Sequence, residues 1–247
     1  MIKKPLISII TVVYNDIENI EETILSVLSQ TYDNIELIVI DGASNDGTAE
    51  VIKKYDKKID YWISEKDGGI FDAMNKGIKV SKGDYINFMN SGDFFTSADL
   101  VNEVVKNLDN QRIDLLYGNR NSNDGNYSKI NIKYHIQLTY QTICHQVIFA
   151  NKNCFENNMF DLKYRWMCDY KWLLECFLRK AVKIKYIDKE ICYVEPIPNA
   201  VTKSDRLKKL YERGEIGHKY FFNFKKILFD INQLRLVTKF RYFWKYR

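Results

Sequence analysis

The strongest constraint on the fold is a repeat of strand and helix patterns within the first 55 residues. Residues 6–13 and 36–40 are almost wholly apolar and rich in β-branched side chains, which is typical of strands buried on both faces of a parallel sheet. Residues 18–29 carry apolar side chains at helical spacing, and residues 49–55 form a second helical pattern. This order predicts a right-handed βαβ unit and therefore an α/β domain.

The alternation of strand and helix patterns continues along the chain and predicts a mostly parallel, Rossmann-like sheet flanked by helices. The apolar run 85–89 is the clearest later strand, because the turn-forming sequence Asn90-Ser91-Gly92-Asp93 ends it abruptly. We expect the other later strands at residues 61–64, 114–118, 127–134, 182–187 and 191–194. We expect the other later helices at residues 71–80, 97–108, 154–160 and 169–179.

The composition is that of a globular protein. The chain has 247 residues, of which 46% are hydrophobic and 28% charged, so it can bury a sizeable core. We expect no signal peptide, and no apolar stretch approaches the ~20 residues that span a bilayer. The five cysteines form no C-x-x-C pair, which favours a reducing, cytoplasmic compartment over a disulfide frame or a zinc site.

Charge divides the chain unevenly near residue 203. Residues 203–247 hold 13 Lys and Arg against 4 Asp and Glu, whereas residues 1–202 hold 24 against 28. The basic segment has helical propensity, and eleven aromatic residues lie in its last 37 positions. We therefore expect one domain over residues 1–202 and a helical, basic-aromatic extension over residues 203–247. Such an extension could lie on an anionic membrane, bind nucleic acid or pack against another surface; we favour the membrane and expect no nucleic acid.

Four carboxylates follow predicted strands or begin a predicted helix: Asp41, Asp67, Asp93 and Asp169. Because the carboxyl ends of parallel strands meet at one edge of a sheet, these groups are expected to gather there. Gathered carboxylates suit Mg²⁺ or Mn²⁺, which commonly takes one or two of them together with substrate phosphates. The pattern therefore indicates a site for a nucleotide diphosphate. The alternative, that the Asp-Gly pairs only form turns, stays open at this point.

Three other kinds of site are excluded by missing motifs. A dinucleotide-binding oxidoreductase needs G-x-G-x-x-G after the first strand, whereas residues 14–19 read YNDIEN and contain no glycine. The chain also lacks the lysine motif of a phosphate-binding P-loop and the G-x-S-x-G of a nucleophilic serine.

Several ordered motifs together resemble the family 2 glycosyltransferases, which have the GT-A fold. The first of them are SIITVVYN at residues 8–15, SQTY at 29–32 and ELIVIDGASNDGT at 36–48. The sequences EKDGGIFDAMNKGI at 65–78 and GDYINFMNSGD at 83–93 resemble the branch found in bacterial capsule, colanic-acid and O-antigen clusters. The resemblance is strong through residue 95, weaker to about residue 195 and absent from the basic extension.

The resemblance implies that residues 1–118 bind the nucleotide sugar. Tyr14 would lie near the nucleobase with Asn15 beside it. Asp41 would accept a hydrogen bond from the base, usually uracil, and Asp67 would line the nucleotide–sugar pocket.

The resemblance also places a metal site after the strand 85–89. The four residues that follow this strand occupy the D-x-D-D region, which holds the ribose and the metal in the family: Asn90, Ser91, Gly92 and Asp93. Asp93 would be the ligand of Mn²⁺ or Mg²⁺. Asn90 and Gly92 stand where the family has carboxylates, so the region carries less negative charge, although Asn90 keeps an oxygen.

The acceptor side is implied to lie in residues 119–202. The pair His145-Gln146 would lie near the acceptor or the pyrophosphate. Asp169 aligns with the second residue of the family's E-D pair and would be the general base, while Cys168 replaces the Glu. An aspartate at a helix start is stabilised as the anion by backbone N–H groups, and it could then take a proton from a sugar hydroxyl. Asp72 is a second candidate for an acceptor-side carboxylate, or it is only an exposed helix residue.

Together these assignments predict a metal-dependent, inverting glycosyltransferase. It would move a sugar from a nucleotide-diphosphate sugar, which the resemblance implies is a UDP-sugar, to an oligosaccharide or lipid-linked acceptor in bacterial surface polysaccharide synthesis. Residues 203–247 would hold it on the inner face of the cell membrane. The alternative is a catalytically silent nucleotide-sugar or glycan-binding protein of the same fold, because carboxylates are missing at Asn90, Gly92 and Cys168.

Overall fold

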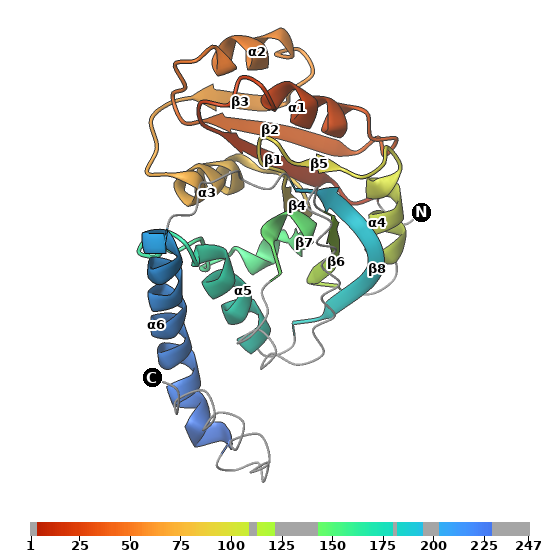
Figure 1. Ribbon diagram of the computed structural model, residues 1–247. Helices are drawn as coiled ribbons and strands as arrows, with labels where there is room; N and C mark the ends of the chain where they lie inside the picture. The colour runs from red at the N-terminus through yellow and green to blue at the C-terminus, as the bar shows by residue number, and fades with distance from the viewer. Residues whose placement is uncertain (1–3, 109–112, 122–142, 180–181, 195–202, 229–247) are drawn as a thin grey trace. The chain divides into compact units, whose positions relative to one another are not determined.

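A computed structural model of the protein describes residues 4–108, 113–121, 143–179, 182–194 and 203–228. Within these ranges, a single mixed sheet has the strand order β3-β2-β1-β4-β7-β6-β8-β5 (Figure 1). The strands are β1 (Ile7–Val13), β2 (Ile35–Asp41), β3 (Tyr61–Ser64), β4 (Tyr85–Phe88), β5 (Phe94–Phe95), β6 (Leu115–Asn121), β7 (Ile148–Asn151) and β8 (Ile184–Tyr193). The α-helices are α1 (Ile20–Leu28), α2 (Thr48–Lys54), α3 (Ile70–Val80), α4 (Leu100–Leu108), α5 (Cys168–Leu178) and α6 (Lys203–Leu228), and short 3₁₀ turns are η2 (His145–Val147) and η3 (Lys152–Cys154).

One half of the sheet is parallel, as the sequence predicts. Strand β1 pairs with β2 on one side and β4 on the other, and β2 pairs with β3. Every residue of β1 is buried, because helices cover both faces. Right-handed crossovers put α1 and α2 on one face and α3, which returns the chain to β4, on the other. Helix α3 packs closely on β1, since a Cβ on Gly77 would lie only 2.4 Å from Cγ2 of Ile10.

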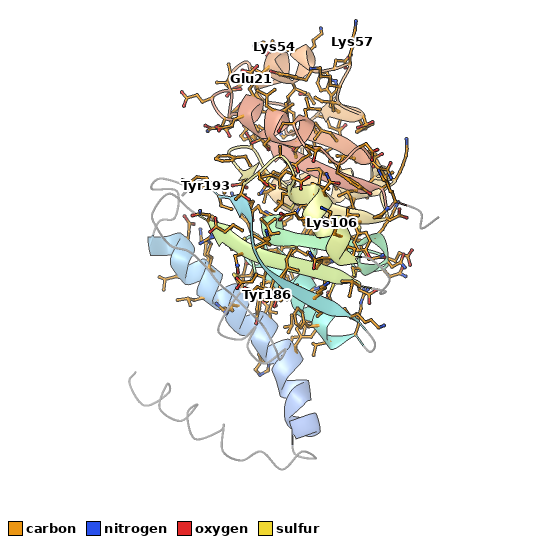
Figure 2. The ribbon with its side chains drawn as sticks, turned by 90° about the vertical axis from the view of Figure 1, so that its right-hand side faces the viewer. Glu21, Lys54, Lys57, Lys106, Tyr186 and Tyr193 are labelled. Atoms are coloured by element: carbon orange, nitrogen blue, oxygen red, sulfur yellow. The ribbon has the colours of Figure 1, made fainter. Side chains whose placement is uncertain are left out.

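The other half of the sheet mixes strand directions. Strand β7 runs antiparallel to both β4 and β6, β8 runs parallel to β6, and β5 runs antiparallel to β8. The two strands expected at 182–187 and 191–194 are one long, curved strand, β8, with Tyr186 and Tyr193 toward its two ends (Figures 1 and 2). The prediction of two strands is wrong because the register of β6 on β8 shifts around Asn119, so that the polar residues between the two apolar runs stay within the strand.

The helix expected at 154–160 is also absent. Only the single turn η3 (Lys152–Cys154) forms, where the side chain of Asn151 accepts a hydrogen bond from the backbone N–H of Asn153. Further along, Asn157 has a φ of +56°, in the left-handed region that ends a right-handed helix. The strand expected at 127–134 lies outside the described residues.

The chain divides into two compact units, Met1–Ala200 and Val201–Arg247. The first unit contains the sheet and helices α1 to α5, and the second contains α6. Among the described residues, none of the helices has the length and apolar character needed to cross a bilayer.

Candidate active site

The parallel strands bring three polar segments to the same edge of the sheet. The backbone N–H of Gly42, just after β2, donates to the carbonyl oxygen of Val13 at the end of β1 (2.9 Å). The N–H of Ser91, after β4, donates to the carbonyl oxygen of Val12 (3.1 Å). The segments that follow β1, β2 and β4 therefore start side by side, which is the edge where open α/β sheets bind ligands.

Asp41 ends β2 and is fully buried, with its carboxylate already hydrogen-bonded. The hydroxyl groups of Ser44 and Ser64 both donate to it, and the backbone N–H of Ser44 donates at 3.1 Å. Ser64 ends β3 as Asp41 ends β2, so the two strand ends meet through this contact. The sequence alone gives no signal that either serine has this role, although Ser64 stands at a predicted strand end.

Gly42 lies between two of the residues that the resemblance places on the donor side. A Cβ at this position would come within 2.8 Å of Oδ2 of Asp67 and 3.2 Å of Cδ2 of Tyr14. The Tyr14 side chain is 65% exposed, so its ring is open to a ligand. Tyr14, Asp41 and Asp67 therefore border one region at the ends of β1 and β2.

Asn15 and Asp72 hold loops in place. Asn15 has a φ of +50°, its backbone N–H donates to Oγ of Ser44 (2.8 Å), and its side-chain oxygen accepts from the N–H of Asn45 (2.9 Å). Asp72, in the first turn of α3, accepts a hydrogen bond from the N–H of Gly68 (2.9 Å). Asp72 thus closes the turn that carries Asp67, and among the described residues no hydrogen bond or ion pair joins it to Asp169.

The turn after β4 is built around Thr23 of α1. The Thr23 hydroxyl accepts from the N–H of Gly92 (3.0 Å) and donates to the carbonyl oxygen of Asp93 (2.9 Å). Gly92 has a φ of +86°, which explains a glycine where the family has a carboxylate. The Ser91 hydroxyl donates to the carboxylate of Asp16 (2.6 Å), which joins this turn to the segment after β1.

Asp93 and Gln146 are paired inside the site. Asp93 is only 5% exposed, and Oδ2 of its carboxylate accepts a hydrogen bond from Nε2 of Gln146 (2.8 Å). The backbone carbonyl oxygen of Gln146 in turn accepts from the buried amide of Asn87 in β4 (2.8 Å). The position of Gln146, and with it one contact of Asp93, is therefore set by β4.

His145 bridges the end of β4 and the start of α5. Its Nε2 lies 2.8 Å from Nδ2 of Asn90, and its Nδ1 lies 3.3 Å from Oδ2 of Asp169. An amide nitrogen can only donate, so Nε2 of a neutral His145 accepts and the ring proton is on Nδ1, facing the carboxylate. Asp169 also accepts from the N–H of Tyr170 (2.7 Å) and lies in the first turn of α5, where the helix dipole favours an anion.

Cys168 does not replace the missing Glu as an acid. The side chain is buried, and its thiol donates to the carbonyl oxygen of Asp161 (3.3 Å). Burial, with a smaller contribution from the charge of Asp169, raises the pKa of the Cys168 thiol well above its usual range. The thiol therefore stays neutral, and Asp169 is the one carboxylate of this pair.

The oxygen atoms near Asp93 fit a hard cation that is shared with a ligand. Within the described parts of the chain, no group of three or more His, Cys, Asp and Glu side chains could hold a metal. The side-chain oxygens of Asn90 and Gln146, however, are buried and lack a hydrogen-bond partner. A carboxylate and amide oxygens are ligands that Mg²⁺ and Mn²⁺ accept, and such ions commonly complete their coordination with substrate phosphates.

Known proteins with similar sequences are glycosyltransferases. Residues 8–192 match the family model described as glycosyl transferase family 2. An uncharacterised glycosyltransferase of Mycobacterium tuberculosis is 40% identical over 109 residues, which are 44% of this chain and 42% of that protein. The chain therefore matches less than half the length of that relative.

Two solved structures share the fold. TarS of S. aureus, in complex with UDP-GlcNAc, superposes with a TM-score of 0.68 and 17% identity over 87% of this chain and 73% of that one. A mannosyltransferase of Pyrobaculum calidifontis, in complex with GDP-Man and Mn²⁺, gives a TM-score of 0.64 and 18% identity over 84% of this chain and 61% of that one. These likenesses confirm the predicted GT-A type of fold. Because the family model covers most of the chain, this protein belongs to glycosyl transferase family 2.

Proposed function

We propose that the protein transfers a sugar from a nucleotide-diphosphate sugar, with uridine as the expected nucleoside, to a hydroxyl of a saccharide acceptor with inversion. The observation that carries the proposal is the pairing of adjacent residues with two carboxylates: His145 with Asp169 and Gln146 with Asp93. This pairing supports a reaction in which the proton acceptor lies close to the diphosphate site. The UDP-GlcNAc held by the structurally similar TarS supports a nucleotide-sugar donor.

The nucleoside would lie at the ends of β1 and β2. The exposed ring of Tyr14 offers a stacking surface, and Asp67 lies across Gly42 from it. Asp41 is fully buried and holds Ser44 and Ser64, so it would act on the base by positioning these two serines or by exchanging one of them for the base. Asn15 would keep the loop after β1 in place.

Asp169 would act as the general base. A carboxylate oxygen takes the proton of the acceptor hydroxyl while that oxygen attacks the anomeric carbon. The bond from the anomeric carbon to the diphosphate oxygen breaks on the opposite face, and its electron pair leaves with the nucleotide diphosphate. The Nδ1 proton of His145 would keep one oxygen of Asp169 occupied, so that the other oxygen receives the proton. One displacement of this kind inverts the anomeric centre.

A divalent cation fits this scheme on the diphosphate side. Asp93 would hold it, with the buried side-chain oxygens of Asn90 and Gln146 available as further ligands. Bound Mg²⁺ or Mn²⁺ would neutralise charge on the leaving diphosphate. The Mn²⁺ bound by the structurally similar mannosyltransferase supports this assignment. Asp72 is then left to hold the Asp67 turn.

The acceptor and the cellular place belong to the same proposal. We infer a saccharide acceptor, lipid-linked, in bacterial capsule or O-antigen synthesis, with the protein held on the inner face of the cell membrane by residues 203–247. Helix α6 supports this because it combines basic residues with Leu207, Leu210 and Tyr211, whose side chains are 59%, 65% and 74% exposed. Exposed apolar side chains among basic ones are typical of helices at a membrane surface.

The decisive experiment separates transfer from binding alone. Calorimetric titration with UDP and GDP, with and without Mn²⁺, measures donor recognition, and release of nucleotide diphosphate from UDP-sugars measures turnover. We expect Mn²⁺-dependent binding together with a slow release of nucleotide diphosphate by hydrolysis, and a faster release when an acceptor receives the sugar in place of water. Binding without turnover, with a panel of donors and lipid-linked acceptors, would instead establish the silent nucleotide-sugar-binding protein, which the single carboxylate at residues 90–93 keeps as the second candidate.

A further inference from the structure

Arg120 lies near the end of β6, which β8 alone separates from β5, the short strand that follows Asp93. The side chains on either side of it point the other way, since Nδ2 of Asn119 donates to Asp188 and Nδ2 of Asn121 donates to Glu190, both at 3.0 Å. Neighbouring residues of a strand project to opposite faces, so Arg120 projects to the other face. Its partner in register on β8 is Cys192, which in turn pairs with Phe95, two residues after Asp93.

Part of the Arg120 guanidinium lacks a partner among the described residues. Its Nε atom is buried without a hydrogen-bond partner, and among the described residues no carboxylate forms an ion pair with it. A buried polar group without a partner is costly, and for a charged group the cost is larger. Proteins tolerate such a group where a ligand completes it.

Arg120 and the two functional carboxylates act electrostatically on the same buried thiol, that of Cys144. Burial raises the pKa of the Cys144 thiol to about 12; the positive charge of Arg120 opposes this effect, while the charges of Asp93 and Asp169 add to it. Burial also raises the pKa of Cys192, with Asp93 and Arg120 again acting in opposite directions. Arg120 therefore lies within electrostatic range of the same two thiols as Asp93, in agreement with the strand register.

We propose that Arg120 binds a phosphate oxyanion of the substrate, in the first place the diphosphate of the donor. The inference rests on the proposed function and adds a residue to it. A guanidinium presents parallel N–H groups that match two phosphate oxygens, and it stays charged at all physiological pH values. It would supply a fixed positive charge opposite Asp93 and stabilise the negative charge that develops on the leaving diphosphate. A phosphate of a lipid-linked acceptor has the same chemistry, so it is the other possible origin of the oxyanion that Arg120 binds.

The test uses the full-length chain and calorimetric titration with UDP, uridine, pyrophosphate and a short polyprenyl phosphate in detergent. Arg120→Gln removes the charge, Arg120→Lys keeps it without the paired N–H groups, and Lys189→Gln is the control. Lys189 lies on the neighbouring strand β8, is 54% exposed and pairs with Glu103, so its loss removes a charge away from the proposed site. Thermal unfolding of each variant reports whether it is folded.

We expect Arg120→Gln to weaken the binding of UDP and of pyrophosphate by about ten- to a hundredfold and to leave the binding of uridine unchanged. The affinities of Arg120→Lys should lie between those of Arg120→Gln and the wild type, and those of Lys189→Gln should equal the wild type. Loss of polyprenyl phosphate binding alone would assign the contact to the acceptor's phosphate.

Unchanged affinity of Arg120→Gln for UDP, pyrophosphate and polyprenyl phosphate overturns the inference. If Arg120→Gln is unfolded, unchanged affinity of Arg120→Lys for these three ligands overturns it instead. Arg120-dependent pyrophosphate binding in a chain that neither binds UDP nor releases it from any donor would overturn the proposed function but not the phosphate site. A wild type that binds no phosphate overturns both.

Discussion

The Nδ1 atom of His145 lies 3.3 Å from the carboxylate of Asp169, and the same ring contacts Asn90 through Nε2. One imidazole therefore joins the end of a sheet strand, where a diphosphate is expected, to the first turn of α5, where the general base is expected. Gln146, the next residue, reaches Asp93. The two adjacent side chains thus connect the two sides of the proposed reaction.

Replacing Asp169 by Asn removes the proposed base while keeping its shape. We expect kcat for sugar transfer to fall by about 10²–10⁴-fold, because general-base catalysis contributes that much, with little change in UDP affinity. Paired measurements of transfer rate and calorimetric UDP binding check this. A loss of UDP affinity as large as the loss of kcat would show that Asp169 serves donor binding instead.

Replacing His145 by Ala leaves Asp169 without its imidazole neighbour. We expect kcat to fall by about ten- to a hundredfold, less than for Asp169→Asn, since a positioning contact is lost and the carboxylate remains. Separate measurement of kcat and KM distinguishes the roles, because a residue that positions the base lowers kcat and leaves the KM of the donor unchanged. If only the melting temperature moved, His145 would have a structural role alone.

Replacing Asp93 by Asn tests the metal site without relying on activity. We expect binding of Mn²⁺ in the presence of UDP, followed by electron paramagnetic resonance, to weaken at least tenfold, because the one carboxylate of the site is lost. Glu65→Gln is a suitable control, since Glu65 is an acidic residue paired with Lys76 outside the turn after β4. Equal Mn²⁺ binding by Asp93→Asn and wild type would show that the metal assignment is wrong.

Replacing Gly42 by Ala adds one methyl group between Tyr14 and Asp67. The new Cβ would lie 2.8 Å from Oδ2 of Asp67, so one of the two side chains must move. We expect UDP affinity to fall by about tenfold, equivalent to roughly 1.4 kcal/mol, with a smaller effect on pyrophosphate, because the nucleoside side is disturbed. If the affinities for UDP and for pyrophosphate fell by the same factor, the nucleoside would not lie beside Gly42.

Replacing both Leu210 and Tyr211 by Ser tests the membrane role of α6 in the full-length chain. We expect flotation with anionic vesicles to fall several-fold, because the exposed apolar side chains no longer enter the bilayer surface. Leu25→Ser is the matched control, since Leu25 is 47% exposed but belongs to α1 in the other compact unit. Vesicle binding that survives the double substitution argues against this face of the helix.

Much of the parallel half of the sheet could be predicted from local patterns. The apolar runs of β1 and β2 mark buried strands whatever lies around them, and the turn residues after each strand mark its carboxyl end. The mixed half could not be predicted as well. Strand β8 contains an apolar run, a polar stretch and a second apolar run, and only its pairing with β6 shows that these are continuous.

The sequence by itself determined the fold class, the family and the edge of the sheet where the polar residues gather, because these depend on periodicity and on motifs within short segments. Only the tertiary structure decided which residues contact one another at that edge. Asn90, His145 and Asp169 are far apart along the chain, and their contacts exist because β4, η2 and α5 pack together. The turn with Gly92, the serines on Asp41 and the Nε atom of Arg120, which has no partner among the described residues, have the same origin, since hydrogen bonds and burial depend on neighbours in space.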